Sequence, residues 1–295
     1  MLRSSANVTA TGPFLFSLAM LISGSIGLFV RLIALSPINI VFFRCAFGAI
    51  ALGLYILGFK RDALTVPRSE LVPILGCGFV LVANWVFLFA AFKQTSITVA
   101  VSIYYLAPVL VTLYGLFFLG QRGTKAVILG ILLAFLGAAL VSGITVEDIL
   151  SLNILGASYA FCAAVLYAAL ILLSKRMKHT DSAVTALVQT TVGVLVLSFF
   201  ADFGMAFADL KWGLIAAIGA LHTALLFILF FRGIRDSPIL LVALLGFIDP
   251  LFAIFLDRFA LGSEISTVQL IGIVCIITAL TLKTFGENKT AQITE

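Results

Sequence analysis

Long apolar runs alternate with short polar links along the whole 295-residue chain. A helix that crosses the hydrocarbon core of a bilayer needs about 20 mostly apolar residues, and each run has about that length. The links between the runs are too short to form a soluble domain. The pattern therefore predicts ten transmembrane helices, at about residues 13–34, 37–58, 71–92, 96–118, 124–143, 153–174, 182–201, 211–231, 237–256 and 265–284.

The composition agrees with this pattern, because 62% of the residues are hydrophobic and 11% are charged, with a mean hydropathy of +1.23. Soluble chains are about 45–50% apolar and about 25% charged. We therefore predict an all-α integral membrane protein in contact with the lipid bilayer. The first run, 13–34, is long enough to span and lacks a small-residue cleavage site, so we expect no cleaved signal peptide.

Local signals mark where several of the predicted helices begin. Ser36-Pro37 and Ser237-Pro238 each place a capping residue before a proline at the first helical position. Asp181 is expected to cap the seventh helix in the same way.

The basic residues are distributed unequally between the two sets of links. If the N-terminus is cytoplasmic, 13 Lys and Arg fall on the cytoplasmic side and 4 on the other side. Short cytoplasmic loops carry an excess of Lys and Arg, so the bias predicts that both termini are cytoplasmic. The net charge of +5 then reflects membrane orientation and not a nucleic-acid partner. The 13 residues are Arg3, Lys60, Arg61, Arg68, Arg122, Lys125, Lys175, Arg176, Lys178, Arg232, Arg235, Lys283 and Lys289, and the other four are Arg31, Lys93, Lys211 and Arg258.

Pro108 and Pro250 each stand inside an apolar run, 142 residues apart. The same offset aligns Lys93 with Arg235. It also aligns the segment FKQTSITVAVSIYYLAPVL with IRDSPILLVALLGFIDPLF without a gap. Each proline removes a backbone hydrogen bond and kinks its helix. The kinks either border a central cavity, where water or a neighbour satisfies the freed carbonyl group, or serve packing without touching substrate.

The offset divides the chain into two five-helix repeats, 13–143 and 153–284, within one membrane domain and with no soluble domain. Because five is odd, the second repeat enters the membrane in the opposite orientation. Inverted repeats recur in secondary transporters, which bind substrate near the midplane between the two halves. We therefore predict alternating access by rocking of the first four helices of each half.

Short motifs recur in order through both halves. The first half contains ISGSIGLFVR at 22–31, FFRCAFGAI at 42–50, AAFKQTS at 90–96, APVL at 107–110 and FLGQR at 118–122. The second half contains VLYAALILLSKR at 165–176, DPLF at 249–252 and ALGSE at 260–264. In this order the motifs resemble the EamA-type members of the drug/metabolite transporter superfamily, over nearly the whole chain.

The resemblance implies a ten-helix transporter of the bacterial cytoplasmic (inner) membrane. The chain looks most like the YddG type, which exports aromatic and other amino acids and the dication methyl viologen. Ser23 stands where the family has Trp in its first helix. The related small multidrug exporters carry a Glu in their first helix, but no acidic residue lies between Met1 and Lys60 here, so their proton-coupling scheme does not transfer.

Charged side chains at bilayer depth are costly and need a reason. Arg44, in the second run, either binds a substrate carboxylate or ties helices together. Asp249 either faces the cavity, where it binds an ammonium group or a proton, or caps the helical segment that begins at Pro250. Ala107 is its counterpart in the first half, which slightly favours a functional role for Asp249.

Uncharged polar and aromatic residues complete the predicted substrate site. His222 in the eighth run titrates in a range that suits proton coupling, or it is a buried neutral histidine bonded to a neighbour. Asn84 and Trp85 lie midway along the third run. Tyr104 and Tyr105 precede Pro108, and Tyr167 lies in the sixth run. Successive helical residues point about 100° apart, so we expect at most one of the two adjacent tyrosines to point squarely at the cavity.

Competing functions make different demands on the sequence. An intramembrane enzyme needs a cluster of His, Asp, Glu or Cys, whereas the chain has two His, one of them, His179, in a predicted loop. We therefore predict no catalytic residue, metal or cofactor. A sugar-phosphate or nucleotide-sugar carrier needs several inward-facing cations, whereas a pocket lined by Tyr, Trp and aliphatic groups with few charges also suits a lipophilic cation. A receptor or structural membrane component needs no inverted repeat, and no P-loop sequence for ATP is present. The sequence favours a monomeric secondary exporter of amino acids and related compounds.

Overall fold

The computed structural model describes residues 11–33, 35–121, 123–204, 210–262 and 264–292. Arg3, Arg122 and Ser263, which enter the charge and motif arguments above, lie outside these ranges. All regular elements of the described residues are helices, as predicted. They are α1 (Thr11–Gly24), α2 (Ile26–Arg31), α3 (Pro37–Phe59), α4 (Arg68–Gln94), α5 (Ile97–Tyr104), α6 (Leu106–Phe117), α7 (Lys125–Val141), α8 (Val146–Leu150), α9 (Ile154–Ser174), α10 (Ser182–Leu197), α11 (Trp212–Gly219), α12 (Leu226–Asp236), α13 (Ile239–Leu245), α14 (Ile248–Leu261) and α15 (Thr267–Gln292), with a 3₁₀ turn at Arg61–Ala63 and a π-helical segment at Ala220–Leu225.

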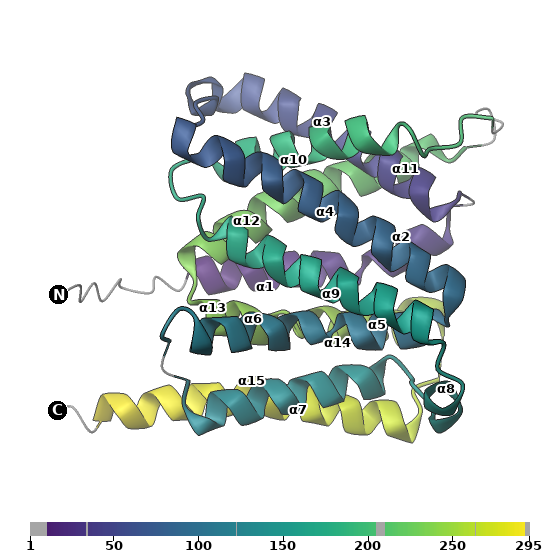
Figure 1. Ribbon diagram of the computed structural model, residues 1–295, viewed down its shortest axis with the longest axis vertical. Helices are drawn as coiled ribbons and strands as arrows, with labels where there is room; N and C mark the ends of the chain where they lie inside the picture. Colours follow the sequence, from purple (N-terminus) through teal and green to yellow (C-terminus); the bar gives the residue numbers. More distant parts are fainter. Residues whose placement is uncertain (1–10, 34, 122, 205–209, 263, 293–295) are drawn as a thin grey trace.

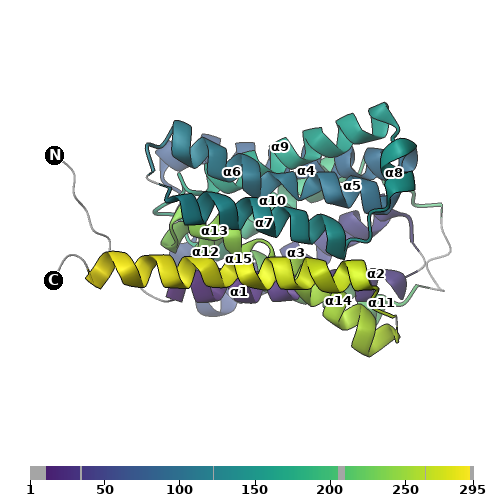
Figure 2. The ribbon, with the colours of Figure 1, turned by 90° about the horizontal axis from the view of Figure 1, so that it is seen from below.

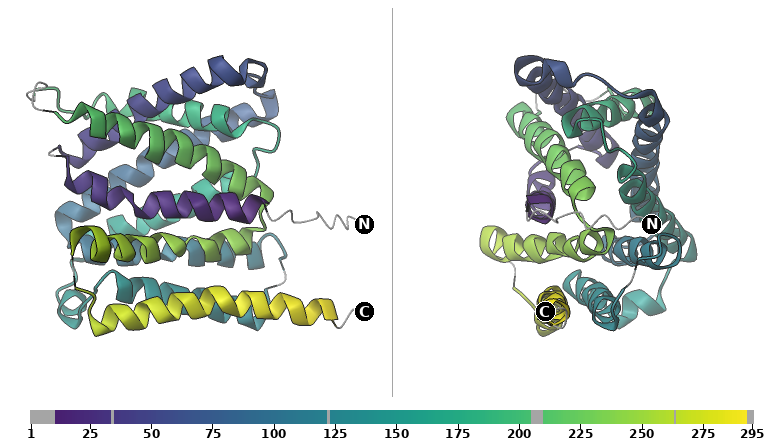
Figure 3. Two further views of the ribbon diagram at one scale, coloured as in Figure 1. Left: turned by 180° about the vertical axis from the view of Figure 1, so that it is seen from behind. Right: turned by 90° about the vertical axis from the view of Figure 1, so that its left-hand side faces the viewer.

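The long helices run side by side and share one long direction (Figure 1). The start of α1, the end of α15 and the links α3–α4, α9–α10 and α12–α13 lie at one end of the bundle (Figure 1). We call this end the basic end, because Lys60 and Lys175 lie in its links and Arg235 lies in the last turn of α12 there, and we call the other the opposite end. Helices α7 and α15 lie next to each other at one side of the bundle (Figures 2 and 3).

Seven helical spans are long and apolar enough to cross a membrane. They are Thr11–Val30, Pro37–Phe59, Arg68–Gln94, Ile97–Phe117, Ile154–Ser174, Trp212–Asp236 and Ile239–Ala260. Three further apolar helices are shorter, at Lys125–Val141, Ser182–Leu197 and Thr267–Thr281. Each of these ten segments overlaps one predicted run, but several ends differ. The seventh helix stops at Leu197 instead of 201, and the eighth continues to Asp236 instead of 231.

The spans that contain Pro108 and Pro250 are both interrupted, which confirms the predicted kinks. The break between α5 and α6 falls at Tyr105, three residues before Pro108, and the break between α13 and α14 falls at Gly246 and Phe247, before Pro250. A proline at position i cannot bond the carbonyl group at i−4, so each interruption lies where the helical ladder loses that bond.

Two other irregularities have no proline and were not predicted. The first span breaks between α1 and α2 at Ser25, whose hydroxyl group donates to the carbonyl oxygen of Ile22 at 2.7 Å. The eighth span contains the π-helical segment Ala220–Leu225, which holds His222. Such single-turn π segments occur often at functional sites.

Two of the three predicted N-caps are confirmed. Ser36 accepts a hydrogen bond from the backbone N–H of Asn39, and Asp181 accepts one from the N–H of Ala183. The cap at Ser237 is wrong, because Pro238 itself stands at the N-cap of α13. The backbone of Ser237 is extended where α12 ends, its hydroxyl group is buried, and no partner for that hydroxyl group is found among the described residues.

Glycines allow several helices to approach closely. A Cβ atom on Gly137 would lie 2.7 Å from the carbonyl oxygen of Gly272, so α7 and α15 are in backbone contact there. A Cβ atom on Gly12 would lie 2.6 Å from the carbonyl oxygen of Asp236, which brings α1 against the end of α12. Small residues serve this purpose in membrane helices generally.

Candidate substrate cavity

A cavity of about 430 Å³ lies inside the bundle. Its walls come from α1 and α2, α3, α4, α5 and α6, α9, α12, and α13 and α14. Helices α7 and α15 contribute no described residue to it. Three of the interrupted spans border the cavity, and irregular backbone at bilayer depth is tolerated in such a place.

Most of the residues that the sequence singles out line this cavity, and two do not. Pro250 and His222 lie outside the lining. The lining includes Arg44, Asn84, Trp85, Tyr104, Tyr105, Pro108, Tyr167 and Asp249.

Three aromatic rings form a column along one wall. The rings of Tyr104 and Tyr167 are stacked at a centroid distance of 5.3 Å with an angle of 14° between their planes. The ring of Phe230 continues the stack, 6.4 Å from that of Tyr167. Tyr105, where the span is interrupted, also lines the cavity. The expectation that at most one of the two adjacent tyrosines points squarely into it stays a prediction.

Asn84 joins α4 to two other walls. Its side-chain N–H group donates to the carbonyl oxygen of Ala163 on α9 at 2.6 Å, and its side-chain oxygen accepts from the hydroxyl group of Tyr104 at 3.2 Å. The side chain is almost fully buried. Asn84 therefore positions Tyr104, and with it the aromatic column.

Arg44 is held by the π-helical segment. Its Nε–H donates to Oγ1 of Thr223 at 3.2 Å, and its Nη2–H donates to the carbonyl oxygen of His222 at 3.0 Å. The guanidinium group also lies over the ring of Trp85, 5.2 Å from its centroid, in a cation–π contact. Arg44 thus ties helices together, as one of the two interpretations expected, and its side chain also borders the cavity.

Asp249 brings a carboxylate to the cavity wall beside the broken first span. The side chain of Ser23 lies beside this carboxylate, and both residues line the cavity. Gly24 packs against the backbone of Asp249, because a Cβ atom at Gly24 would lie 2.5 Å from the carbonyl oxygen of Asp249. The absence of a side chain at Gly24 therefore lets Ser23 reach Asp249.

His222 is fully buried behind the cavity wall. Its Nε2 atom lies 2.8 Å from Oγ of Ser25, and its ring packs edge-on against Phe29. The Ser25 Oγ atom also lies 2.7 Å from the carbonyl oxygen of Ile22, so both contacts are satisfied when Ser25 donates to Ile22 and accepts from Nε2–H of His222. No partner for Nδ1 is found among the described residues. His222 is thus buried and bonded to a neighbour, as one of the two interpretations expected, and its neutral state stays a prediction.

Sequence reasoning missed several lining residues, among them Ser23, Phe230 and Gly246. The consecutive small residues Ser23-Gly24-Ser25 inside an apolar run were a usable signal for a helix break. Phe230 had no such signal, because it is one of 27 phenylalanines.

The lining differs in exposure between the two ends of the cavity. Toward the basic end, Ile171, Phe230 and Val242 are each at most 3% exposed. Toward the opposite end, Gly27 is exposed, with nothing within 4 Å of a Cβ atom built on it, and Leu88 is half-buried. The lining is therefore more tightly covered toward the basic end than toward the opposite end.

Comparison with known protein families shows which family this chain belongs to. The model of the EamA-like transporter family matches residues 10–143 and, a second time, residues 154–285. The chain therefore belongs to the EamA-like transporter family. It is a multi-pass membrane transporter and not an enzyme.

Similar proteins support this assignment. The chain is 35% identical over 298 residues to the uncharacterized transporter YxxF of Bacillus subtilis (strain 168), covering 98% of this chain and 94% of the relative. It is 26% identical over 257 residues to an uncharacterized transporter of Archaeoglobus fulgidus, covering 86% and 89% of the two chains. One protein of known crystal structure shares the fold with a TM-score of 0.78 and 20% identity, over 93% of this chain and 97% of that one.

Proposed function

We propose that this protein is a secondary exporter of small amphipathic metabolites, chiefly aromatic and other amino acids, which acts by alternating access around the cavity. One observation carries the proposal. A single cavity combines a guanidinium group, a carboxylate and a column of aromatic rings, which match the three parts of an aromatic amino acid.

The positions of the charges support this substrate class. The Nε and Nη2 donors of Arg44 that face the π-helical segment are used by Thr223 and His222, so the group is held rigid while its other N–H donors remain for a substrate carboxylate. Asp249, with the Ser23 hydroxyl group beside it, is the complementary site for an ammonium group. The Tyr104–Tyr167–Phe230 column is suited to stack on an aromatic side chain.

Reciprocal contacts support ten spans arranged as two inverted repeats. When residue i of the first half contacts residue j of the second half, the equivalent positions i + 142 and j − 142 also meet. Lys60 pairs with Asp181 at 2.7 Å at the basic end. The equivalent positions, Asp202 and Asn39, also meet, with the Asp202 N–H and carbonyl groups bonded to the Asn39 side chain at 2.9 and 2.8 Å at the opposite end. Such exchange is what a two-fold axis in the membrane plane produces.

The helix pairs repeat this relation. The close approach of Gly137 to Gly272 has its counterpart in Gly130 and Ala279, where a Cβ atom on Gly130 would lie 3.4 Å from the carbonyl oxygen of Ala279. Helices α4 and α9 pack together, as do their counterparts α12 and α1. We further propose that both termini are cytoplasmic in a bacterial inner membrane, from the charge bias, and that one chain forms a complete pathway.

The test is counterflow in proteoliposomes that contain the purified chain and are preloaded with unlabelled phenylalanine or threonine. Uptake of labelled amino acid above that of empty liposomes is expected. Asp249→Asn should abolish it, because the amide carries no charge for the ammonium group. Asp257→Asn, on the same helix but outside the cavity lining, is the matched control and should transport normally.

Each other result has a definite meaning. Full counterflow in the Asp249→Asn variant would contradict the ammonium site. Absence of counterflow from well-folded wild-type protein would exclude the amino-acid proposal. A lipophilic-cation exporter is the second candidate, because Asp249 and the aromatic column alone satisfy it. A nucleotide-sugar or sugar-phosphate carrier is less well supported, since Arg44 is the only basic side chain among the described cavity-lining residues.

A further inference from the structure

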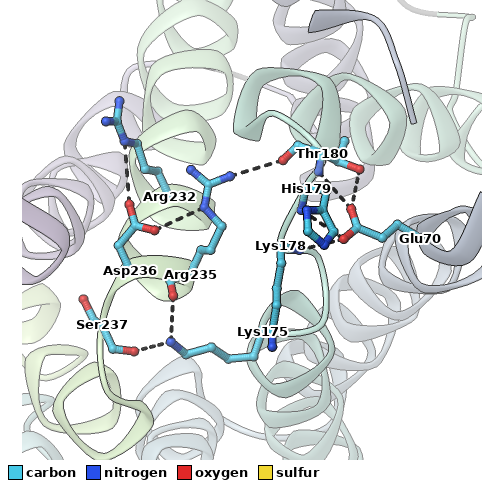
Figure 4. A network of polar contacts seen from close by, with 9 residues as sticks. All are labelled: Glu70, Lys175, Lys178, His179, Thr180, Arg232, Arg235, Asp236 and Ser237. Atoms are coloured by element: carbon cyan, nitrogen blue, oxygen red, sulfur yellow. Dashed lines mark hydrogen bonds and ion pairs between the residues drawn. The ribbon is translucent and has the colours of Figure 1, made fainter. Parts of the chain in front are cut away.

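A group of polar contacts joins several helix ends at the basic end of the bundle (Figure 4). Lys175, just past the end of α9, donates through Nζ to the carbonyl oxygen of Arg235 at 3.0 Å and to that of Ser237. Arg235 in turn donates through Nη1 to the carbonyl oxygen of Thr180 at 3.2 Å. These contacts join the end of α9 and the α9–α10 link to the end of α12 and the start of α13.

The same contacts stand directly beyond the cavity lining on three helices. Lys175 is one turn past Ile171 on α9. Arg235 lies a little more than a turn past Phe230 on α12, and Ser237 stands just before α13, which supplies Val242 to the wall. A path from the cavity to the basic end therefore requires these helix ends to separate and the contacts to break.

Glu70, in the first turn of α4, fixes the α9–α10 link in place (Figure 4). Its carboxylate accepts the backbone N–H groups of Lys178 at 2.8 Å, His179 at 3.0 Å and Thr180 at 2.9 Å, and the hydroxyl group of Thr180 at 2.6 Å. Successive N–H groups that converge in this way form a strong anion site. The carbonyl group of Thr180 is consequently directed at Arg235.

We propose that Lys175, Arg235 and the Thr180 carbonyl group form a latch that holds the cavity closed at the basic end, and that Glu70 is its positioning residue. The latch rests on the alternating-access function proposed above, and it defines which contacts must break in each cycle. Burial lowers the pKa of Lys175 to about 8, while the nearby Asp236 raises it and Lys178 lowers it, so the ammonium group remains charged at neutral pH.

Among the described residues, the latch is only partly repeated at the opposite end. A shift of 142 carries Arg235 to Lys93, which keeps the charge, but it carries Glu70 to Trp212 and Lys175 to Ile33, neither of which is charged. The contacts that hold the helix ends together are therefore stronger at the basic end than at the opposite end, although the two halves repeat the same helices. The latched state, open toward the opposite end, is then the resting state of the protein without substrate.

Thiol labelling in nanodiscs tests the latch without any substrate. The four native cysteines are replaced by alanine, and one reporter is introduced at a time: Val242→Cys for the closed end or Gly27→Cys for the open end. Glu70→Gln replaces an acceptor by a donor facing the Thr180 N–H and hydroxyl groups, and Lys175→Met removes the crossing donor. Asp62→Asn, a carboxylate lost from the same end of the bundle, is the matched control.

Both latch variants should raise the maleimide labelling rate at Val242→Cys about tenfold, the effect of losing a charged hydrogen bond, and should lower the rate at Gly27→Cys. Asp62→Asn should change neither. Unchanged rates in the two latch variants would overturn the proposal, and so would a rise at both reporters, which indicates a loosened fold. Because no substrate is present, these outcomes are independent of whether amino acids are transported.

Discussion

At the residue scale, the side chains around the cavity have two roles. Some are available to a substrate, and others hold those side chains in place. Asn84 is nearly fully buried and uses both ends of its amide on protein partners. Arg44 uses two donors on the π-helical segment. The sequence identified these residues by polarity in an apolar run, but it could not distinguish the positioning role from the binding role, because that depends on neighbours far away in the chain.

Tyr104 offers both a ring and a hydroxyl group, and single substitutions separate them. Tyr104→Phe keeps the stack on Tyr167 and loses one hydrogen bond to Asn84, so the KM for phenylalanine counterflow should rise only about two- to tenfold. Tyr104→Ala removes the stacked ring and should raise the KM by about tenfold or more. Tyr114, stacked on Phe118 outside the cavity lining, is the control position, and its alanine variant should retain the wild-type KM. Equal KM values for the Phe and Ala variants at position 104 would contradict stacking on substrate.

At the element scale, helix interruptions shape the site. The sequence predicted the breaks near Pro108 and Pro250, because proline has a fixed physical effect on the helical ladder. It did not predict the break at Ser25 or the π-helical segment at Ala220–Leu225. These two depend on each other, since Ser25 and His222 bond across the gap between them, and such a tertiary contact leaves no periodic signal in either segment.

The interruption at Tyr105 is expected to be functional and not stabilising. Pro108→Ala restores a backbone N–H that can bond the carbonyl group of Tyr104, so the helix should straighten across Tyr105. The melting temperature should stay equal or rise, while amino-acid counterflow should fall about tenfold as the two tyrosines rotate away. Pro73→Ala in the continuous helix α4, outside the cavity lining, should leave counterflow unchanged. Normal transport by Pro108→Ala would show that the kink serves packing only.

At the scale of the whole molecule, two kinds of contact connect the helices. Helices α3 and α10 are joined at both ends, by Lys60 with Asp181 and by Asn39 with Asp202. The latch joins α9 to α12 and α13 at one end only. The sequence could predict the repeat, because segments of the two halves align without a gap at an offset of 142 residues. It could not predict which end is closed, because the latch uses mainly backbone carbonyl and N–H groups.

This difference predicts which helix ends move during transport. In a cysteine-free background, a short bifunctional thiol reagent should cross-link Lys60→Cys to Asp181→Cys, and Asn39→Cys to Asp202→Cys, without slowing counterflow, because α3 and α10 stay together in both states. The same reagent joining Lys175→Cys to Ser237→Cys should stop counterflow, and reductive cleavage of a disulfide-containing reagent should restore it. If a cross-link between α3 and α10 blocks transport as fully as the latch cross-link does, the two helices separate during the cycle. The interface between α3 and α10 would then be one along which the helices slide during transport. It would not be the fixed part of the protein against which the cavity opens and closes.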